Sequence, residues 1–226
     1  MKALLSIPDT KTFIGMRDYV LMSMMYITGC RIDEVLSIQL RDLHLNVKSS
    51  PFVSVLGKGS IRRSPYLPKN IASNLETYIR KYHLSDDIGR YLFYSNNRGP
   101  DCKLSQEAIR KQLSKYAKTA HQICDEVPLD FHSHQFRHSM AVHRLEDDMN
   151  IVQLSKELGH ASIETTMVYL DVVPGKKERA IAEFESEEIK NFQENGPHKY
   201  KNLKTFLNVM DKNNPKKMNI KELIIC

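Results

Sequence analysis

Residues 12–28 have the composition of a helix that is buried on almost every side. Apart from Ser23, the residues from Tyr19 to Ile27 are apolar and cover all faces of successive turns, so other elements must surround this helix. We therefore predict a central core helix over residues 12–28. Its apolar run, which ends at Thr28, is too short to cross a lipid bilayer, and no membrane insertion is expected.

The corner after this helix places an arginine beside two acidic residues. Gly29 is expected to end the core helix, and a second helix is predicted to begin at Ile32. Asp33 and Glu34 lie in the first turn of that helix, where carboxylates suit the positive end of the helix dipole. Arg31 therefore lies at a sharp turn between two helices, where it either pairs with Glu34 or faces a ligand.

A short hairpin is predicted between residues 52 and 67. Residues 52–56 form an apolar strand, the Gly57-Lys58-Gly59-Ser60 segment a turn, and residues 61–67 the returning strand. Lys58 is thereby placed at or beside the tip, either as a solvated turn residue or as a cation that reaches a ligand. Residues 91–94 can form a third strand. The expected fold class is α+β, mostly helical, with a small antiparallel β-sheet.

Basic residues gather beside the hairpin and on a later helix. Pro68 opens a predicted helix that continues to about His83, and Ser105 is expected to cap a basic amphipathic helix further on. These cations are either candidate contacts to a nucleic-acid backbone or a solvated face. The candidates are Arg62, Arg63, Arg110, Lys111, Lys115 and Lys118.

The segment HQFRH, from His134 to His138, sets an imidazole and a guanidinium on one face of a helix. His134 and Arg137 are three residues apart and can both face one ligand, and both side chains bind phosphate. A zinc site at His134 and His138 is conceivable from their spacing. The glutamate of an HExxH motif is missing and no cysteine lies nearby, so no metal is expected.

Two more short helices are predicted to follow. One is capped by Asn150 and ends at Gly159, and the next starts at Ser162 and carries Tyr169 about two turns on. His160 lies in the turn between them. His160 is either a helix-end residue or a ligand contact, and Tyr169 is either an interior tyrosine or a reactive one. The three helices are expected to bring His134, Arg137, His160 and Tyr169 within reach of each other.

Composition limits the setting in which the chain works. The 226 residues suffice for one large domain, or for a domain with an appendage. A net charge of +6 favours an anionic partner, without choosing among nucleic acid, a membrane surface and mere solubility. The 4 cysteines are scattered singly and no leader peptide is visible, so a reducing cytoplasmic location is expected.

Five motifs in chain order resemble the catalytic domain of the tyrosine recombinase (phage integrase) family. They are TGCRIDE from Thr28, GKGSIRRSPYLP from Gly57, HQFRH from His134, LGH from Leu158, and Tyr169. The resemblance covers about residues 12–185, and the combination is specific although no single motif is. Gln135 and Phe136 differ from the residues that the family often has there, which affects packing more than chemistry.

The resemblance implies a site-specific DNA recombinase that works through a covalent 3′-phosphotyrosine intermediate, as the integrase or transposase of a mobile element. It implies that Arg31 and Arg137 clamp the phosphate and that Tyr169 is the nucleophile. It also implies that His134 assists proton transfer, that His160 hydrogen-bonds the phosphate and that Lys58 protonates the leaving oxygen, with Glu34 in support. The expected partner is double-stranded DNA, bound by a homo-tetramer that is a monomer or weak oligomer when free. No cofactor is expected.

The resemblance also suggests a domain organisation. Family members usually have a helical DNA-binding domain before the catalytic one, and residues 1–11 are too few for it, so weak DNA binding is expected. The catalytic domain is predicted over residues 12–175. Residues 176–226 are predicted to form a helix and tail that protomers exchange.

Other functions remain open at this point. A type IB topoisomerase shares the chemistry but relaxes DNA without exchanging strands. A non-catalytic DNA-binding module would keep the fold without the activity, and a helical interaction module with a basic surface would need Tyr169 for stability alone.

Overall fold

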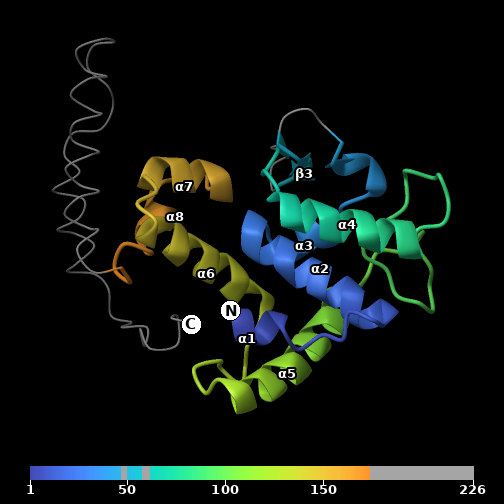
Figure 1. The fold of residues 1–226 in the computed structure, drawn as a ribbon. Coiled ribbons are helices and arrows are strands. Elements are labelled where there is room, and N and C mark those ends of the chain that lie inside the picture. Colours follow the sequence, from blue (N-terminus) through green and yellow to red (C-terminus); the bar gives the residue numbers. More distant parts are fainter. Residues whose placement is uncertain (47–49, 58–61, 174–226) are drawn as a thin grey trace, which may run out of the picture.

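The computed structural model describes residues 1–46, 50–57 and 62–173. The chain folds as a mostly helical α+β unit around helix α2, Phe13–Thr28 (Figure 1). Helix α1, Lys2–Leu5, precedes it, and α3, Ile32–Leu36, and the short 3-10 helix η1, Leu40–Asp42, follow it. The longer helices further on are α4, Lys69–Tyr82, α5, Gln106–Ile123, and α6, Ser133–Glu146. Two short ones, α7, Ile151–Leu158, and α8, Glu164–Met167, complete the described part.

Helix α2 is the central core helix that its composition predicts. The Thr12 hydroxyl accepts a hydrogen bond from the Gly15 amide and caps its start. Gly29 ends it in the left-handed conformation, with φ of 59°. Between these ends α2 packs against α6 and α4, which lie on its two sides in Figure 1. This position fixes where the corner after Gly29 meets α6.

The sheet is smaller and more divided than predicted. Residues 52–56 do not form one strand, because β2, Phe52–Val53, pairs with β1, Leu43–His44, whereas β3, Val55–Leu56, pairs with β4, Arg62–Arg63. Both pairs are antiparallel. The prediction missed β1, and residues 91–94 make only an isolated bridge, Gln39 with Tyr91. The antiparallel pairing of β3 with β4 agrees with the predicted hairpin, whereas its predicted turn, with Lys58, lies outside the described residues apart from Gly57.

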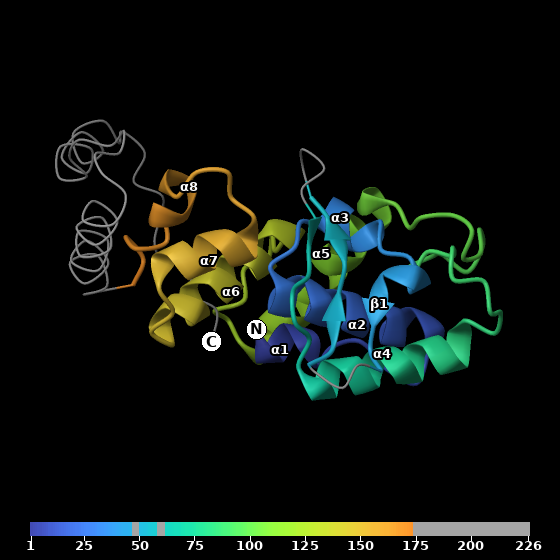
Figure 2. The same ribbon diagram turned by 90° about the horizontal axis from the view of Figure 1, so that it is seen from above.

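Two hydrophobic clusters meet along α2 and α6. The larger one contains α1 to α5 with the strands, and the smaller one contains the later turns of α6 with α7 and residues 169–173. Figure 2 shows α6, α7 and α8 together on one side of the molecule and the strands with α4 on the other. The Tyr26 hydroxyl and His143 Nδ1 lie 2.7 Å apart and link α2 to α6. The candidate site lies where the two clusters meet.

The first residues of the chain belong to the larger cluster. Leu4 is fully buried there, and α1 packs against α2 and α5. Along the described residues, no helix combines the length and the apolar character needed to cross a membrane. The predicted helix and tail over residues 176–226 lie outside the described residues.

Candidate active site

Arg137 is the most deeply buried charged residue of the site. It lies on α6 with 1% of its surface exposed. Its Nη1 donates to the Gly29 carbonyl at 2.6 Å, and its Nη2 donates to the Leu158 carbonyl at 2.8 Å. Burial, together with the charges of Arg31 and Arg63, lowers the pKa of Arg137 to about 10. The guanidinium is still charged at pH 7, and it joins the end of α2 to the end of α7.

Arg31 and Glu34 form the corner that the sequence predicts. The Arg31 amide donates to Glu34 Oε2 at 2.9 Å, and Arg31 Nη1 lies 3.3 Å from Glu34 Oε1. The Glu34 side chain is 7% exposed, whereas that of Arg31 is 42% exposed. Arg31 therefore pairs with Glu34 while part of its side chain stays open to solvent, so the ion pair is compatible with a contact to a ligand.

Tyr169 lies in a turn, not on a helix as predicted. Helix α8 begins at Glu164 and ends at Met167, and no side chain caps it. The predicted cap at Ser162 and the predicted two helical turns up to Tyr169 are therefore wrong. Tyr169 packs into the smaller cluster with 4% of its surface exposed. Burial raises the pKa of its hydroxyl, and the charge of Arg137, a hydrogen bond from it and the charge of Arg31 act in the opposite direction.

His160 follows the left-handed Gly159 that ends α7, as the sequence predicts. Its Nδ1 lies 2.7 Å from the hydroxyl oxygen of Thr166, which is fully buried. The pKa of His160 is lowered to about 4, mainly by burial and then by the positive charges of Arg137 and Arg31. The imidazole is therefore neutral at pH 7. If the threonine hydroxyl donates to Nδ1, the other ring nitrogen carries the proton and can donate to a bound anion.

His134 and His138 meet edge to face on α6, and His138 also contacts Tyr169. The rings of His134 and His138 are perpendicular with centroids 4.6 Å apart, and His138 meets Tyr169 edge to face at 5.3 Å. Burial and then the charge of Arg137 lower the pKa of His134, and burial and then His134 lower that of His138 to about 4. From sequence alone, His138 is a candidate only for a metal ligand. Its spacing of four residues from His134 already places it on the same face.

The predicted surface cations differ in their surroundings. Arg63 is turned inward, where it contacts Glu34 and the end of α7, whereas Arg62 on the same strand is exposed. On α5, Arg110 and Lys111 both pair with Glu107, and Lys118 is exposed on the same helix, as is Lys115. Lys58 lies outside the described residues. Among the described residues, no cluster of three or more His, Cys, Asp or Glu side chains is placed to hold a metal ion.

The structure thus places His134, Arg137, His160 and Tyr169 in one region, together with Arg31, Glu34, Arg63 and His138. Similar structures have been solved. XerH site-specific recombinase bound to palindromic difH substrate, in a post-cleavage complex, matches with a TM-score of 0.64 at 21% identity, over 81% of this chain and 50% of that one. XerA recombinase matches with a TM-score of 0.63 at 22% identity, over 88% of this chain and 63% of that one. The fold is that of a tyrosine-recombinase catalytic domain.

Sequence comparison agrees with the fold. Tyrosine recombinase XerD of Listeria monocytogenes serotype 4b (strain F2365) is 33% identical over 175 residues, which are 76% of this chain and 56% of that protein. Tyrosine recombinase of Pseudothermotoga lettingae is 32% identical over 166 residues, 73% of this chain and 53% of that protein. The chain spans about half the length of the curated relatives it matches. The sequence model of the phage integrase family matches residues 1–175, and the chain belongs to that family.

Proposed function

We propose that this chain cuts and rejoins double-stranded DNA as a site-specific recombinase, with Tyr169 as the nucleophile that forms a 3′-phosphotyrosine link. The observation that carries the proposal is the placement of Tyr169 beside Arg137, with Arg31, His134 and His160 around them. The relatives and solved neighbours that carry the same fold are named as recombinases or integrases.

The two arginines suit the charge that develops during phosphoryl transfer. When an oxygen attacks a phosphodiester, negative charge grows on the non-bridging oxygens of the phosphorus. Forked guanidinium groups donate two hydrogen bonds to such oxygens and stay charged at every physiological pH. Arg31 offers an exposed guanidinium, and buried Arg137 offers a fixed positive charge close by. Donors that are already in place stabilise the transition state without reorganising.

Proton transfer needs help because the tyrosine hydroxyl is protonated at pH 7. In the proposed step the Tyr169 oxygen bonds to phosphorus, its proton passes to His134, and the bond from phosphorus to the 5′-oxygen breaks. The depressed pKa of His134 keeps its imidazole neutral at pH 7 and able to accept that proton. His160 donates to a phosphate oxygen, and Lys58, by resemblance to the family, supplies the proton that the leaving 5′-oxygen takes up.

The covalent intermediate explains rejoining without an energy source. The phosphotyrosine bond preserves the energy of the broken strand, so a second 5′-hydroxyl can attack the phosphorus and release Tyr169.

We propose a homo-tetramer on DNA, with residues 176–226 exchanged between protomers, a catalytic domain over residues 12–175, and a cytoplasmic role in the movement of a mobile element. A Tn1549 transposon integrase bound to transposon right end DNA shares the fold, with a TM-score of 0.61 at 17% identity.

The test is to trap the covalent link. The full chain is incubated in EDTA with supercoiled plasmid, nicked plasmid and fragments of host genomic DNA, then denatured and digested with nuclease. Mass spectrometry should find a nucleotide on Tyr169. Tyr169→Phe should abolish the adduct, and Tyr26→Phe, which alters a tyrosine on α2, should keep it.

Two other results would contradict the proposal. Binding of DNA without any adduct would favour the non-catalytic module. An adduct with relaxation of the plasmid, but without joined products from two different duplexes, would favour a type IB topoisomerase.

A further inference from the structure

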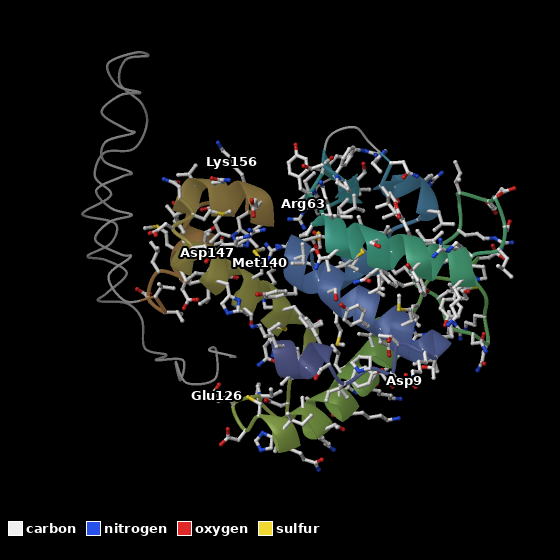
Figure 3. The ribbon with its side chains drawn as sticks, in the orientation of Figure 1. Asp9, Arg63, Glu126, Met140, Asp147 and Lys156 are labelled. Carbon is white, nitrogen blue, oxygen red and sulfur yellow. The ribbon has the colours of Figure 1, made fainter. Side chains whose placement is uncertain are left out.

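Arg63 contacts two separate elements, α3 and the end of α7, with one guanidinium. It lies on β4 with a side chain 12% exposed, and it donates to the Glu34 carboxylate on α3. It also donates to the Leu158 carbonyl and, at 3.2 Å, to the Glu157 carbonyl, both at the end of α7. Figure 3 shows Arg63 in the space between the hairpin and α7. A surface cation that served only DNA would not need these internal acceptors.

The groups that accept hydrogen bonds from Arg63 also contact Arg137 and Arg31, the two arginines proposed to bind the phosphate. The Leu158 carbonyl that Arg63 contacts also accepts a hydrogen bond from Arg137 Nη2 at 2.8 Å. The Glu34 carboxylate that it contacts also binds the Arg31 amide and lies 3.3 Å from the Arg31 guanidinium. Arg63 therefore shares the Leu158 carbonyl with Arg137 and the Glu34 carboxylate with Arg31.

The position of Arg31 depends on Arg63 because both arginines pair with the Glu34 carboxylate. Glu34 is a buried carboxylate with two cationic partners among the described side chains, Arg63 and Arg31. Removal of the Arg63 charge would leave Arg31 as the remaining partner there. A buried carboxylate without compensation is costly, so it would hold the Arg31 guanidinium more tightly and compete with a phosphate for it.

The backbone of the Leu-Gly-His turn is fitted closely around the Arg63 side chain. A Cβ placed on Gly159 would lie 2.9 Å from Arg63 Nη1, and Gly159 has a φ of +65°. Both the turn conformation and the approach of the guanidinium therefore need glycine at this position. The turn also leads directly to His160, so Arg63 contacts the backbone that carries a third proposed site residue.

We infer that Arg63 is a positioning residue, which sets the geometry of Arg31 and Arg137 through Glu34 and the Leu158 carbonyl, and is not a contact to the DNA backbone. This inference rests on the proposed function. It replaces the earlier interpretation of Arg63 as a phosphate contact and leaves that interpretation to Arg62, whose side chain is exposed on the same strand.

The experiment compares Arg63→Lys and Arg63→Met with Arg62→Met in the full chain. Lysine keeps the charge but cannot serve three acceptors with a planar fork. The first measurement is the affinity for a generic 30-base-pair duplex at several salt concentrations, because each lost phosphate contact lowers the slope of log K against log salt by about 0.9. The second is the initial rate of Tyr169 adduct formation on plasmid DNA at saturating DNA, below the unfolding temperature of each variant.

We expect both Arg63 variants to keep the wild-type salt slope and to form the adduct at least tenfold more slowly at saturating DNA. Adding Glu34→Gln to Arg63→Met should recover part of the rate, because the unbalanced carboxylate is then neutral. A purely structural role would lower stability without changing the rate of the folded protein at saturating DNA.

Two outcomes would overturn the inference. One is a salt slope that falls by about 0.9 in Arg63→Met. The other is a wild-type rate at saturating DNA in Arg63→Lys. Absence of an adduct from the wild-type protein would instead remove the proposed function, and the positioning role with it.

Discussion

The imidazole ring of His138 meets the phenol ring of Tyr169 edge to face, with 5.3 Å between ring centroids. The His134 ring also meets His138 edge to face, with centroids 4.6 Å apart. His138 thus contacts both the proposed base and the proposed nucleophile. A ring in this position limits how far the tyrosine side chain can turn.

Replacing His138 with alanine should therefore slow adduct formation on Tyr169 by roughly tenfold, since a misplaced reacting group loses rate steeply. His138→Phe keeps a ring against Tyr169 and should retain more of the rate than His138→Ala. The comparison is made on folded protein at saturating DNA. Equal rates in the alanine variant and the wild type would show that the ring contact has no part in placing the nucleophile.

Acid should destabilise the fold through the site histidines. The pKa of His138 and that of His160 are lowered to about 4, and that of His134 is lowered as well, mainly because burial disfavours the charged rings. In the unfolded chain a histidine titrates near pH 6.5. Between these values the unfolded state binds more protons, so stability is complete above about pH 6.5 and falls as the pH drops toward 4.

The expected loss of unfolding free energy between pH 7 and pH 4.5 is on the order of 2 kcal/mol or more, after allowance for partial exposure of the rings. Urea unfolding at a series of pH values measures it. His138→Gln should flatten the dependence by removing one of the rings. An unfolding free energy that stays level from pH 7 to pH 5 would contradict this prediction.

Arg137 should prove essential to both stability and rate. Lysine in its place can donate to the Gly29 carbonyl or to the Leu158 carbonyl, but it lacks the rigid fork that now serves both. Arg137→Lys should lower the unfolding free energy by about 1 to 3 kcal/mol, the cost of leaving a buried acceptor unpaired. Loss of a transition-state donor should slow adduct formation about a hundredfold or more.

Urea unfolding and the adduct assay, run on the same preparation, separate the two effects. Arg144→Lys is the matched control on α6, because Arg144 is 40% exposed and lies 3.8 Å from Glu157 outside the site. A control that lost as much rate as Arg137→Lys would point to general damage to the helix.

Much of this arrangement was predictable from sequence because its signals are local. Ser105 and Asn150 cap helices through their own neighbours, and Gly29 and Gly159 end helices by adopting positive φ. The spacing of His134 and Arg137 needs only the helix period. Such features depend on a few adjacent residues, so their physical causes are visible in the sequence.

The features that the sequence did not predict depend on residues far apart in the chain. The sequence predicts Arg63 as an outward cation, either a candidate DNA contact or part of a solvated face, yet its acceptors at Glu34 and Leu158 lie 29 and 95 residues away. Helix α8 ends at Met167, and Tyr169 follows it in a turn that packs into the smaller cluster, among residues of α6 and α7. The division of residues 52–56 between two strand pairs likewise depends on β1, which precedes them.

Gly29 offers a test of how tightly the two clusters are fitted together. It has a φ of +59°, and a Cβ on it would lie 2.0 Å from Met140 Cε and 3.1 Å from Leu158 Cδ2. Gly29→Ala therefore combines backbone strain with a clash on α6, labelled at Met140 in Figure 3. Gly99 is a matched control, because its φ is +70° but a Cβ there would have no neighbour within 4 Å.

Gly99→Ala should cost about 1 kcal/mol of unfolding free energy, from the left-handed backbone alone. Gly29→Ala should cost about 1 to 3 kcal/mol more, because methyl groups forced into a packed core displace their neighbours. It should also slow adduct formation, since the Gly29 carbonyl accepts the Arg137 hydrogen bond. Shortening Met140 to alanine removes the side chain that clashes, so the Gly29→Ala, Met140→Ala protein should lose less stability than the two single changes added together. If Gly29→Ala and Gly99→Ala lowered the unfolding free energy equally in urea, the Met140 side chain and α6 would have to shift at Gly29 without loss of stability.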